Sequence, residues 1–225
     1  QRHDGVLTPQ FPMTTLEELG LLKMDFLGLR TLTIIRDALA FIREQGKGAP
    51  DFSTNDFTDK EVYDMISRGD TDGVFQLESA GMRQFLMQLK PDCFEDIIAG
   101  IALYRPGPME SIPRYIQGKH DPSSVHYEDK RLEPILSTTY GCMVYQEQVM
   151  EIVRTLGGYS LGRADIVRRA MSKKKHDVMA REREYFVHGT DGVEGAVKRG
   201  VKEQVADHIF DEMMDFASYA FNKAH

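Results

Sequence analysis

The sequence predicts a mainly α-helical protein with a small β component. Apolar residues recur at helical spacing over most of the chain after residue 58, whereas residues 20–29 form a short apolar run bounded by glycines, as a strand does. The chain has 225 residues, of which 41% are hydrophobic and 28% are charged. That composition is typical of a folded globular protein with a substantial core.

The first part of the chain is predicted to be a strand–turn–helix unit. Alternation along residues 20–29 places three apolar side chains on one face of a strand. A helix is expected from about residue 31 to residue 45, with Gly46 as its C-cap. The apolar stripe of this helix consists of Leu32, Ile35, Leu39 and Ile42.

A connector rich in Gly, Pro, Asp, Ser and Thr follows at residues 45–59, and we expect two domains, 1–46 and 47–225. The second domain is expected to be helical, with Thr58 as the N-cap of its first helix and Ser160 as the N-cap of a basic helix. Few periodic features are present between the Pro-Gly-Pro turn and about residue 137. Other helices are expected at about 81–91, 93–105, 177–187 and 202–216. Residues 140–158 are expected to form a short extended piece that leads into a helix ending at Gly157–Gly158.

Composition also limits the compartment in which the protein works. Its two cysteines, Cys93 and Cys142, are far apart in the sequence, which argues against a disulfide framework and suits a reducing cytoplasm. No apolar run approaches the roughly 20 residues that a membrane-spanning helix needs, so no membrane association is predicted. The chain starts at Gln1 and ends without a helix stop signal, so we expect an internal part of a longer cytoplasmic protein.

The main functional signal is a concentration of positive charge in residues 163–175. This segment has six basic residues and one acidic residue, whereas the whole chain has a net charge of −7. One interpretation is structural: Asp165 pairs with Arg168 or Arg169 on a solvated helix face. The other is functional, because the five cations from Arg168 to Lys175 repel one another unless a polyanion, such as a triphosphate or a nucleic-acid backbone, lies over them.

Two other segments carry candidate site residues. Lys23 and Asp25 lie two residues apart on the predicted strand, so their side chains point the same way. They form either a strand-end ion pair or part of a metal site, which would need further carboxylates. Arg105 precedes the Pro-Gly-Pro turn and is held at a helix end, either as part of an ordinary helix stop or as a phosphate contact.

The C-terminal segment, residues 218–225, interleaves aromatic, amide and cationic side chains. Such a segment can stack on a base and bind its phosphates, or it can be a helix end whose Phe216 and Phe221 lie in the core. The histidines give no convincing metal pair, and His120 and His126 are better interpreted as loop residues. The sequence has neither a Gly-rich phosphate loop nor a nucleophile triad.

Together these segments resemble the C-family DNA polymerase III alpha subunit of bacteria. The resemblance covers essentially the whole chain, and Gly28-Leu29-Arg30-Thr31 is similar to the DnaE type rather than the PolC type. The stretches that occur in the order and approximate spacing of that family are LLKMDFLGLRTLTII, GVFQLESAGMRQFL, ALYRPGPM, YGCMVYQEQVM, ADIVRRAMSKKK and FNKAH.

The resemblance implies a polymerase built from palm, thumb and fingers. Residues 1–46 would be the end of a palm similar to that of the polymerase-beta nucleotidyltransferases, and residues 47–225 a helical fingers domain. Asp25 and Lys23 are the candidate catalytic residues: Asp25 matches one of three palm aspartates that hold two Mg²⁺ ions, and Lys23 matches a lysine beside them. The other two aspartates belong to an upstream Asp-x-Asp motif outside this sequence.

The resemblance also assigns nucleotide-binding residues in the fingers. Arg168 and Arg169 match arginines near the incoming triphosphate, and Ala224 stands where relatives commonly have serine. The residues that match the lining of the nucleotide pocket are Tyr219, Asn222, Lys223 and His225. Charge and position add the candidate phosphate contacts Arg105, Lys173, Lys174 and Lys175.

The implied activity is template-directed addition of deoxynucleotides to a primer 3′ end with release of pyrophosphate. The partners would be primer-template DNA and deoxynucleoside triphosphates, and in the full protein the sliding clamp, the clamp loader and other replisome subunits at the nucleoid. This chain alone is predicted to be inactive, because one carboxylate cannot assemble a two-metal site. The competing interpretations are a non-catalytic helical module that binds nucleic acid or protein through its basic helix, and a piece that folds alone without a separate function.

Overall fold

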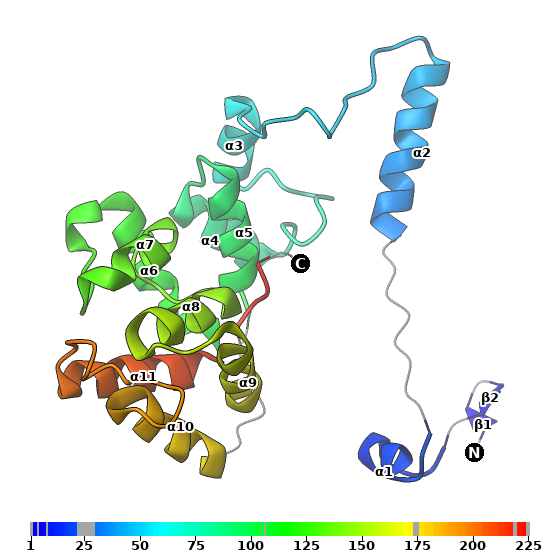
Figure 1. Cartoon of the computed structure of the whole chain (residues 1–225). Helices are drawn as coiled ribbons and strands as arrows, with labels where there is room; N and C mark the ends of the chain where they lie inside the picture. The colour runs from blue at the N-terminus through cyan, green and yellow to red at the C-terminus, as the bar shows by residue number, and fades with distance from the viewer. Residues whose placement is uncertain are drawn as a thin grey trace. The chain divides into compact units, whose positions relative to one another are not determined.

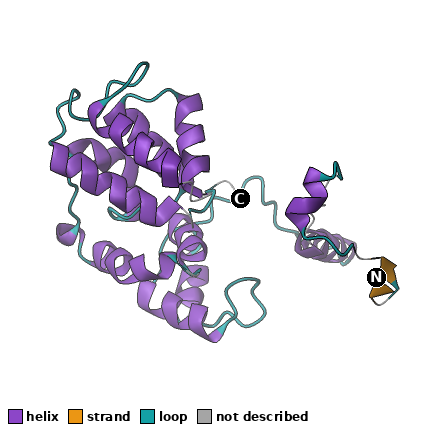
Figure 2. Ribbon diagram, turned by 90° about the horizontal axis from the view of Figure 1, so that it is seen from below, coloured by secondary structure: helices purple, strands orange, loops and turns teal. Residues whose placement is uncertain are grey.

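The structure, a computed structural model, describes residues 2–3, 5–7, 9–21, 30–105, 107–172, 176–217 and 220–223. In these residues the chain is mainly helical, and its strands form one short hairpin besides isolated bridges (Figures 1 and 2). This confirms the predicted mainly α-helical class with a small β component. None of the described helices is long and apolar enough to cross a membrane.

The chain divides into two compact units, residues 1–56 and 57–225. The division lies inside the connector that the sequence places at residues 45–59, where Gly, Pro and short polar residues disfavour regular structure. The assignment of the first domain to a palm and of the second to a fingers domain stays a prediction.

The first unit begins with a hairpin and a short helix. β1 (Arg2–His3) pairs antiparallel with β2 (Val6–Leu7). Gly5, at φ +82°, lies in the turn between them, where a side chain would be strained. The helix α1 (Met13–Glu18) follows. The predicted strand carrying Lys23 and Asp25 falls on residues 22–29, which lie outside the described part of the chain.

The second helix of this unit, α2 (Arg30–Glu44), confirms the predicted helix within a residue at each end. The N–H of Gly46 donates to the carbonyl of Arg43 at 2.9 Å, and Gly46 has φ +69°, as expected of a glycine that ends a helix. Its predicted apolar stripe is not buried: Leu32 is 68% exposed, and no residue of α2 is buried. The described part of the first unit therefore leaves this stripe uncovered.

The second unit begins with α3 (Lys60–Ser67). Its N-cap lies one residue later in the chain than predicted. The cap is Asp59, whose Oδ1 accepts the backbone N–H of Glu61 at 2.9 Å. Thr58 was expected in this role. An aspartate carboxylate one residue further along serves as well or better, because it also interacts favourably with the positive end of the helix dipole.

The next two helices end where the sequence predicts. In α4 (Ala80–Leu89), the N-cap Ser79 accepts a backbone N–H of the first turn at 3.3 Å. Lys90 ends the helix in the left-handed conformation, φ +49°, directly before Pro91. The following helix, α5 (Phe94–Leu103), stops before the Pro-Gly-Pro turn.

A further helix, α6 (Ile112–His120), lies in the stretch for which few periodic features were noted. Only Tyr115 and Gly118 are buried in it, so it carries no long apolar stripe that would predict a helix. A Cβ on Gly118 would lie 2.8 Å from the Cβ of Tyr140, which explains why glycine is needed there. The short elements of the same stretch are Pro108–Ser111, Pro122–Ser124, Lys130–Leu132 and Ser137–Thr139, which are 3₁₀ turns, and α7 (Glu133–Leu136).

The last four helices confirm the prediction closely. Ser160 is the N-cap of the basic helix, because its Oγ accepts the N–H of Arg163 at 3.3 Å. Gly158, at φ +77°, ends the helix before it. The four helices are α8 (Gln146–Gly157), α9 (Leu161–Ser172), α10 (His176–His188) and α11 (Glu203–Ala217).

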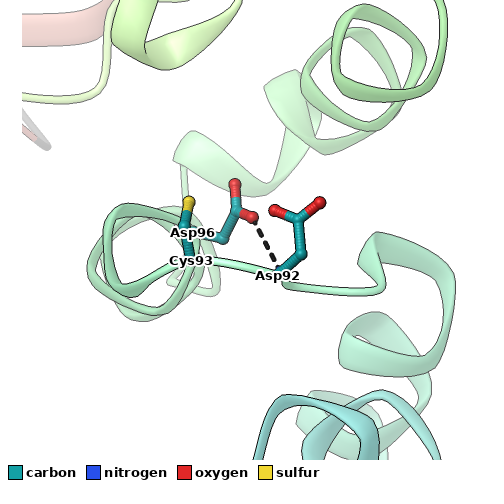
Figure 3. Close-up of side chains that lie close together, drawn as sticks. All are labelled: Asp92, Cys93 and Asp96. Atoms are coloured by element: carbon teal, nitrogen blue, oxygen red, sulfur yellow. Dashed lines mark hydrogen bonds between the residues drawn. The ribbon is translucent and has the colours of Figure 1, made fainter. Parts of the chain in front are cut away.

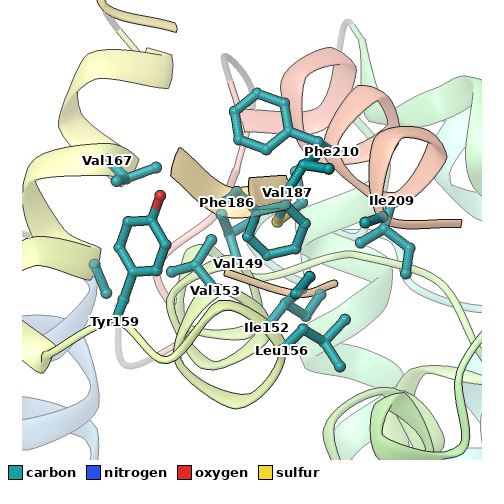
Figure 4. Packing of buried hydrophobic residues seen from close by; sticks show 14 of the residues in the cluster. Val149, Ile152, Val153, Leu156, Tyr159, Val167, Phe186, Val187, Ile209 and Phe210 are labelled. Atoms are coloured by element: carbon teal, nitrogen blue, oxygen red, sulfur yellow. The ribbon is translucent and has the colours of Figure 1, made fainter. Parts of the chain in front are cut away.

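Two hydrophobic clusters form the core of the second unit. The first cluster lies among α3, α4, α5 and α6 and includes the fully buried Leu103 and Tyr115. The second cluster lies among α8, α9, α10 and α11, where Phe186 of α10 packs against α8 and against Phe210 of α11 (Figure 4). Their ring centroids are 5.6 Å apart.

The extended segment 142–145 joins these two clusters. Cys142 and Val144 belong to the first cluster, whereas Met143 belongs to the second. The alternation over residues 142–144 follows from the two-residue period of an extended chain, whose successive side chains point to opposite sides. It ends at Tyr145, which also belongs to the first cluster. The segment therefore fixes the start of α8 at the junction of the two clusters.

Candidate nucleotide-binding site

The basic helix α9 lies with its apolar side in the second cluster. Val167 and Met171 are almost fully buried there. The side chains of Arg168 and Arg169 are 22% and 67% exposed, respectively. Lys173, Lys174 and Lys175, the other cations assigned to this segment, lie outside the described residues.

Asp165 binds both described arginines of the predicted site. The Nε and Nη2 atoms of Arg168 donate to Asp165 Oδ1 at 3.0 and 2.7 Å, and Arg169 Nη2 lies 2.7 Å from Asp165 Oδ2. The hydrogen bond from Arg168 is the main cause of a lowered pKa for the Asp165 carboxyl. These are the pairs that the structural interpretation predicts. One carboxylate faces two guanidinium groups, so a positive charge remains, and any bound anion would compete with Asp165.

Arg168 has a second partner, at the start of α8. Its Nη1 donates to Oε1 of Gln146, the first residue of that helix, at 2.8 Å. Because the amide of Gln146 is neutral, this hydrogen bond orients the guanidinium group without cancelling its charge. Gln146 is not among the site residues predicted from the sequence.

The C-terminal segment 220–223 runs beside the same helix start. Phe221 pairs with Tyr145 in a parallel bridge, and the N–H of Gln146 donates to the carbonyl of Phe221 at 2.9 Å. The N–H of Lys223 lies 3.2 Å from both carboxylate oxygens of Glu147. Asn222 and Lys223, which were predicted to line a nucleotide pocket, are therefore held next to the residue that binds Arg168.

The ammonium group of Lys223 has partners of its own. Its Nζ lies 2.7 Å from Glu95 Oε2 on α5, and 5.4 Å from the centroid of the Tyr145 ring. The side chains of Lys223 and Glu95 are partly exposed, and an ion pair between partly exposed side chains contributes roughly 0–1 kcal/mol to stability. Lys223 is thus positioned by α5 and by the segment before α8.

Arg105 reaches the same segment from the end of α5. Its guanidinium carbon lies 5.2 Å from the centroid of the Phe221 ring, a cation–π contact. The two side chains line a mainly apolar cavity of about 470 Å³ together with Tyr104 and residues of α4 and α5. Phe221, which one of the two interpretations of this segment places in the core, is partly buried and packs against the first cluster.

The described residues therefore join three of the predicted site residues, Arg105, Arg168 and Lys223, through one short segment. Arg105 contacts Phe221, Phe221 binds Gln146, and Gln146 binds Arg168, while Lys223 binds the neighbouring Glu147. Four further predicted residues, Lys23, Asp25, Tyr219 and His225, lie outside the described residues, as the three lysines do.

A separate acidic cluster at the start of α5 contains residue types that bind metal ions. The carboxylate oxygens of Asp92 and Asp96 and the thiol of Cys93 lie within 4.8 Å of one another (Figure 3). However, Lys119 Nζ lies 2.8 Å from Asp92 Oδ1 and 2.7 Å from Asp96 Oδ2. The ammonium group already supplies the positive charge that a metal ion would bring.

The cluster is a structural ion pair that joins α5 to α6. The side chains of Asp96 and Lys119 are 1% and 6% exposed, and the hydroxyls of Tyr115 and Tyr140 donate to Asp96 Oδ1 at 3.4 and 3.3 Å. Partial desolvation raises the pKa of the neighbouring Cys93 thiol above its usual value. Among the described residues, no group fits a two-magnesium site.

Comparison with known proteins gives the family. Residues 31–193 match the family described as the bacterial DNA polymerase III alpha subunit finger domain. The chain is 48% identical over 223 residues to DNA polymerase III subunit alpha of Bacillus subtilis and 49% identical over 221 residues to that of Staphylococcus aureus. These alignments cover 99% and 98% of this chain but 20% of each relative, so the chain spans about one fifth of the length of these curated relatives.

The matched range runs from α2 to α10 and so includes the basic helix α9. The sequence identity extends over nearly the whole chain. This confirms the family that the six sequence stretches indicated. The chain belongs to the finger-domain family of the bacterial DNA polymerase III alpha subunit.

Proposed function

We propose that the full protein is a replicative DNA polymerase and that this chain supplies the fingers side of its nucleotide site. The reaction adds a deoxynucleotide to the 3′ end of a primer on a template and releases pyrophosphate. The observation that supports this proposal is the connection of Arg105, Arg168 and Lys223 through the short segment at the start of α8.

In this proposal the arginines bind the triphosphate of the incoming nucleotide. Arg169, whose side chain is two-thirds exposed, offers a guanidinium group to phosphate oxygens with little loss of buried contacts. Arg168 is more deeply set and oriented by Gln146. Phosphoryl transfer depends mainly on positioning and on stabilising negative charge, and Lys173, Lys174 and Lys175 would add to the positive potential.

We assign residues 1–46 to the end of a palm domain. Asp25 would be one of three aspartates that hold two Mg²⁺ ions, and Lys23 would lie beside them. Bound metal would activate the primer 3′ hydroxyl and stabilise the leaving pyrophosphate. Asp25 lies outside the described residues. In the acidic cluster at the start of α5, Lys119 already pairs with the carboxylates. The palm assignment is therefore based on the family resemblance.

The substrates and partners follow the same proposal. We expect primer-template DNA, deoxynucleoside triphosphates and, in the full protein, the sliding clamp, the clamp loader and other replisome subunits in the bacterial cytoplasm. We expect no primer extension by the isolated 225-residue chain, because it supplies only one of the three metal-binding aspartates. Extension above background by the purified chain would contradict this.

The test is the double variant Arg168→Ala and Arg169→Ala in the full alpha subunit. Charge-assisted hydrogen bonds contribute about 1.5–3 kcal/mol each, so kcat/KM for the nucleotide should fall by at least about 100-fold. Primer-template affinity should change far less. Arg154→Ala is the matched control, because Arg154 forms an exposed pair with Glu151 on α8 and should leave kcat/KM nearly unchanged.

The same experiment tests the competing interpretation, a binding module. That interpretation is favoured by the exposed side chain of Arg169 and by the positive charge that remains beside Asp165. It predicts weaker DNA affinity on every sequence and a smaller dependence of affinity on salt, without a selective effect on nucleotide KM. Such a result would refute the nucleotide-binding role of the two arginines.

A further inference from the structure

The segment Tyr145–Met150 carries a polar triplet, Gln-Glu-Gln, of which the proposed function uses only Gln146, as a partner of Arg168. In the structure each member of the triplet makes a different contact. Gln146 accepts a hydrogen bond from Arg168, and Glu147 accepts one from the N–H of Lys223. The third member, Gln148, supports the chain that leads into α8.

Gln148 restrains the start of α8 through hydrogen bonds of its buried side chain. Its side chain is almost fully buried, and its Oε1 accepts the N–H groups of Val144 and Tyr145 at 2.8 and 2.9 Å. Its Nε2 donates to the hydroxyl of Thr139 at 2.8 Å and to the carbonyl of Ile135 at 3.2 Å. A buried amide with all these bonds allows little movement of the residues on either side of it.

Gln146, two residues before Gln148, makes hydrogen bonds to two different parts of the second unit. Its backbone N–H donates to the carbonyl of Phe221 at 2.9 Å, and its side-chain Oε1 accepts from Arg168 Nη1 at 2.8 Å. One residue thus connects the C-terminal segment with the basic helix. Asp165 also holds Arg168, but a carboxylate cancels the charge that a triphosphate needs, whereas the amide oxygen of Gln146 leaves it.

We propose that Gln146 is a positioning residue of the nucleotide site, one that holds the guanidinium group of Arg168 in register with residues 221–223. This inference depends on the proposed role of Arg168 in triphosphate binding. Gln146 itself does not need to touch the nucleotide. Its effect on catalysis passes through Arg168, and this distinguishes it from a residue that only stabilises the fold.

The test uses the full alpha subunit and steady-state incorporation of a single nucleotide. Gln146→Ala removes the acceptor and keeps the backbone N–H that binds Phe221, so nucleotide KM should rise about tenfold, equivalent to one charge-assisted hydrogen bond, with kcat changed by less than about threefold. Gln146→Met, similar in length but without an acceptor, should have the same effect. Thermal midpoints should stay within a few degrees of the parent protein.

Two comparisons make the test specific. Gln117→Ala removes an exposed glutamine on α6 and should leave KM unchanged. Gln146→Glu restores an acceptor of the same shape but neutralises Arg168, so KM should rise at least as much as in Gln146→Ala. A return to the parental KM in Gln146→Glu would mean that the charge of Arg168 is irrelevant, and this would overturn the proposal.

A double-mutant cycle separates this inference from the proposed function. In an Arg168→Ala background, Gln146→Ala should raise KM no further, because its effect depends on the arginine. If Arg168→Ala raises KM and Gln146→Ala does not, or if the two effects multiply, the inference fails and the proposed function stands. If Arg168→Ala itself leaves KM unchanged, the proposed function fails as well.

Discussion

The helices α2 and α9 have similar sequence patterns but different surroundings. Both alternate apolar and charged residues with the period of an amphipathic helix. On α9 the apolar side is buried in the second cluster, where Val167 is 1% exposed. On α2 no residue is buried, and the described residues of its own unit provide nothing that covers the stripe.

This difference shows what hydrophobic periodicity does and does not specify. The pattern gives the helix and the face that prefers to be buried, but the partner depends on the rest of the fold. All residues of both hydrophobic clusters belong to the second unit. Among the described residues, the second unit therefore has its own core, and the first unit does not.

The largest expected effect tests this contrast with two phenylalanines. Phe186→Ala removes a fully buried ring that packs on Phe210, so the free energy of unfolding should fall by about 3–5 kcal/mol. Phe41→Ala on α2, where the ring is 61% exposed, should change it by less than about 0.5 kcal/mol. Urea unfolding of the 225-residue chain, followed by circular dichroism, measures both. Equal losses would mean that α2 is buried as deeply as the core.

A smaller effect is expected from breaking one ion pair in each unit. Lys119→Met leaves the buried Asp96 carboxylate without its cation, although two tyrosine hydroxyls still donate to it; we expect a loss of about 3 kcal/mol. Arg36→Met removes an exposed pair with Asp37 and should cost less than about 0.5 kcal/mol. Full recovery of the Lys119→Met variant on adding Zn²⁺ or Mg²⁺ would contradict the structural role of this cluster.

The fold of the second unit could be predicted largely from local signals. The helix ends marked by Ser160, Gly158 and Pro91 are where the sequence places them, because capping and chain-breaking residues act within one turn. The helix α6 was missed because it is held by close packing at Gly118 and by the buried Tyr115 and not by an apolar stripe. Packing of this kind depends on residues far away in the sequence.

In the candidate site, too, local contacts could be predicted from the sequence and tertiary contacts could not. The pairing of Asp165 with Arg168 and Arg169 was anticipated, because residues three and four positions apart meet on a helix. The contacts of Gln146 with Arg168 and of Glu95 with Lys223 join segments that only the tertiary fold brings together. The stretch Tyr145–Met150 carried the one signal that could have pointed to Gln146, since it was among the stretches that gave the family resemblance.

The smallest expected effect concerns acid sensitivity, again with one residue from each unit. Asp129 accepts hydrogen bonds from Arg131 Nε at 2.8 Å and from Nη2 at 2.7 Å, and these bonds lower the pKa of its carboxyl group. The pKa in the folded state therefore lies below the value in the unfolded chain, which is about 3.9. At pH values above about 3.9 the ionised carboxylate contributes its full stabilisation of the fold. This contribution is lost as the pH falls through the folded-state pKa.

Asp129→Asn should therefore lower the free energy of unfolding by about 1–2 kcal/mol at pH 7, and the difference from the parent chain should shrink as the pH falls below about 4. Asp51 is the control from the first unit. Ser53 lowers the pKa of its carboxyl group by hydrogen bonding, but the residue is exposed, so Asp51→Asn should not change stability measurably at any pH. Urea unfolding from pH 3 to pH 7 measures both variants, and a pH-independent loss in Asp129→Asn would show that packing, and not the charge that Arg131 binds, is what Asp129 contributes.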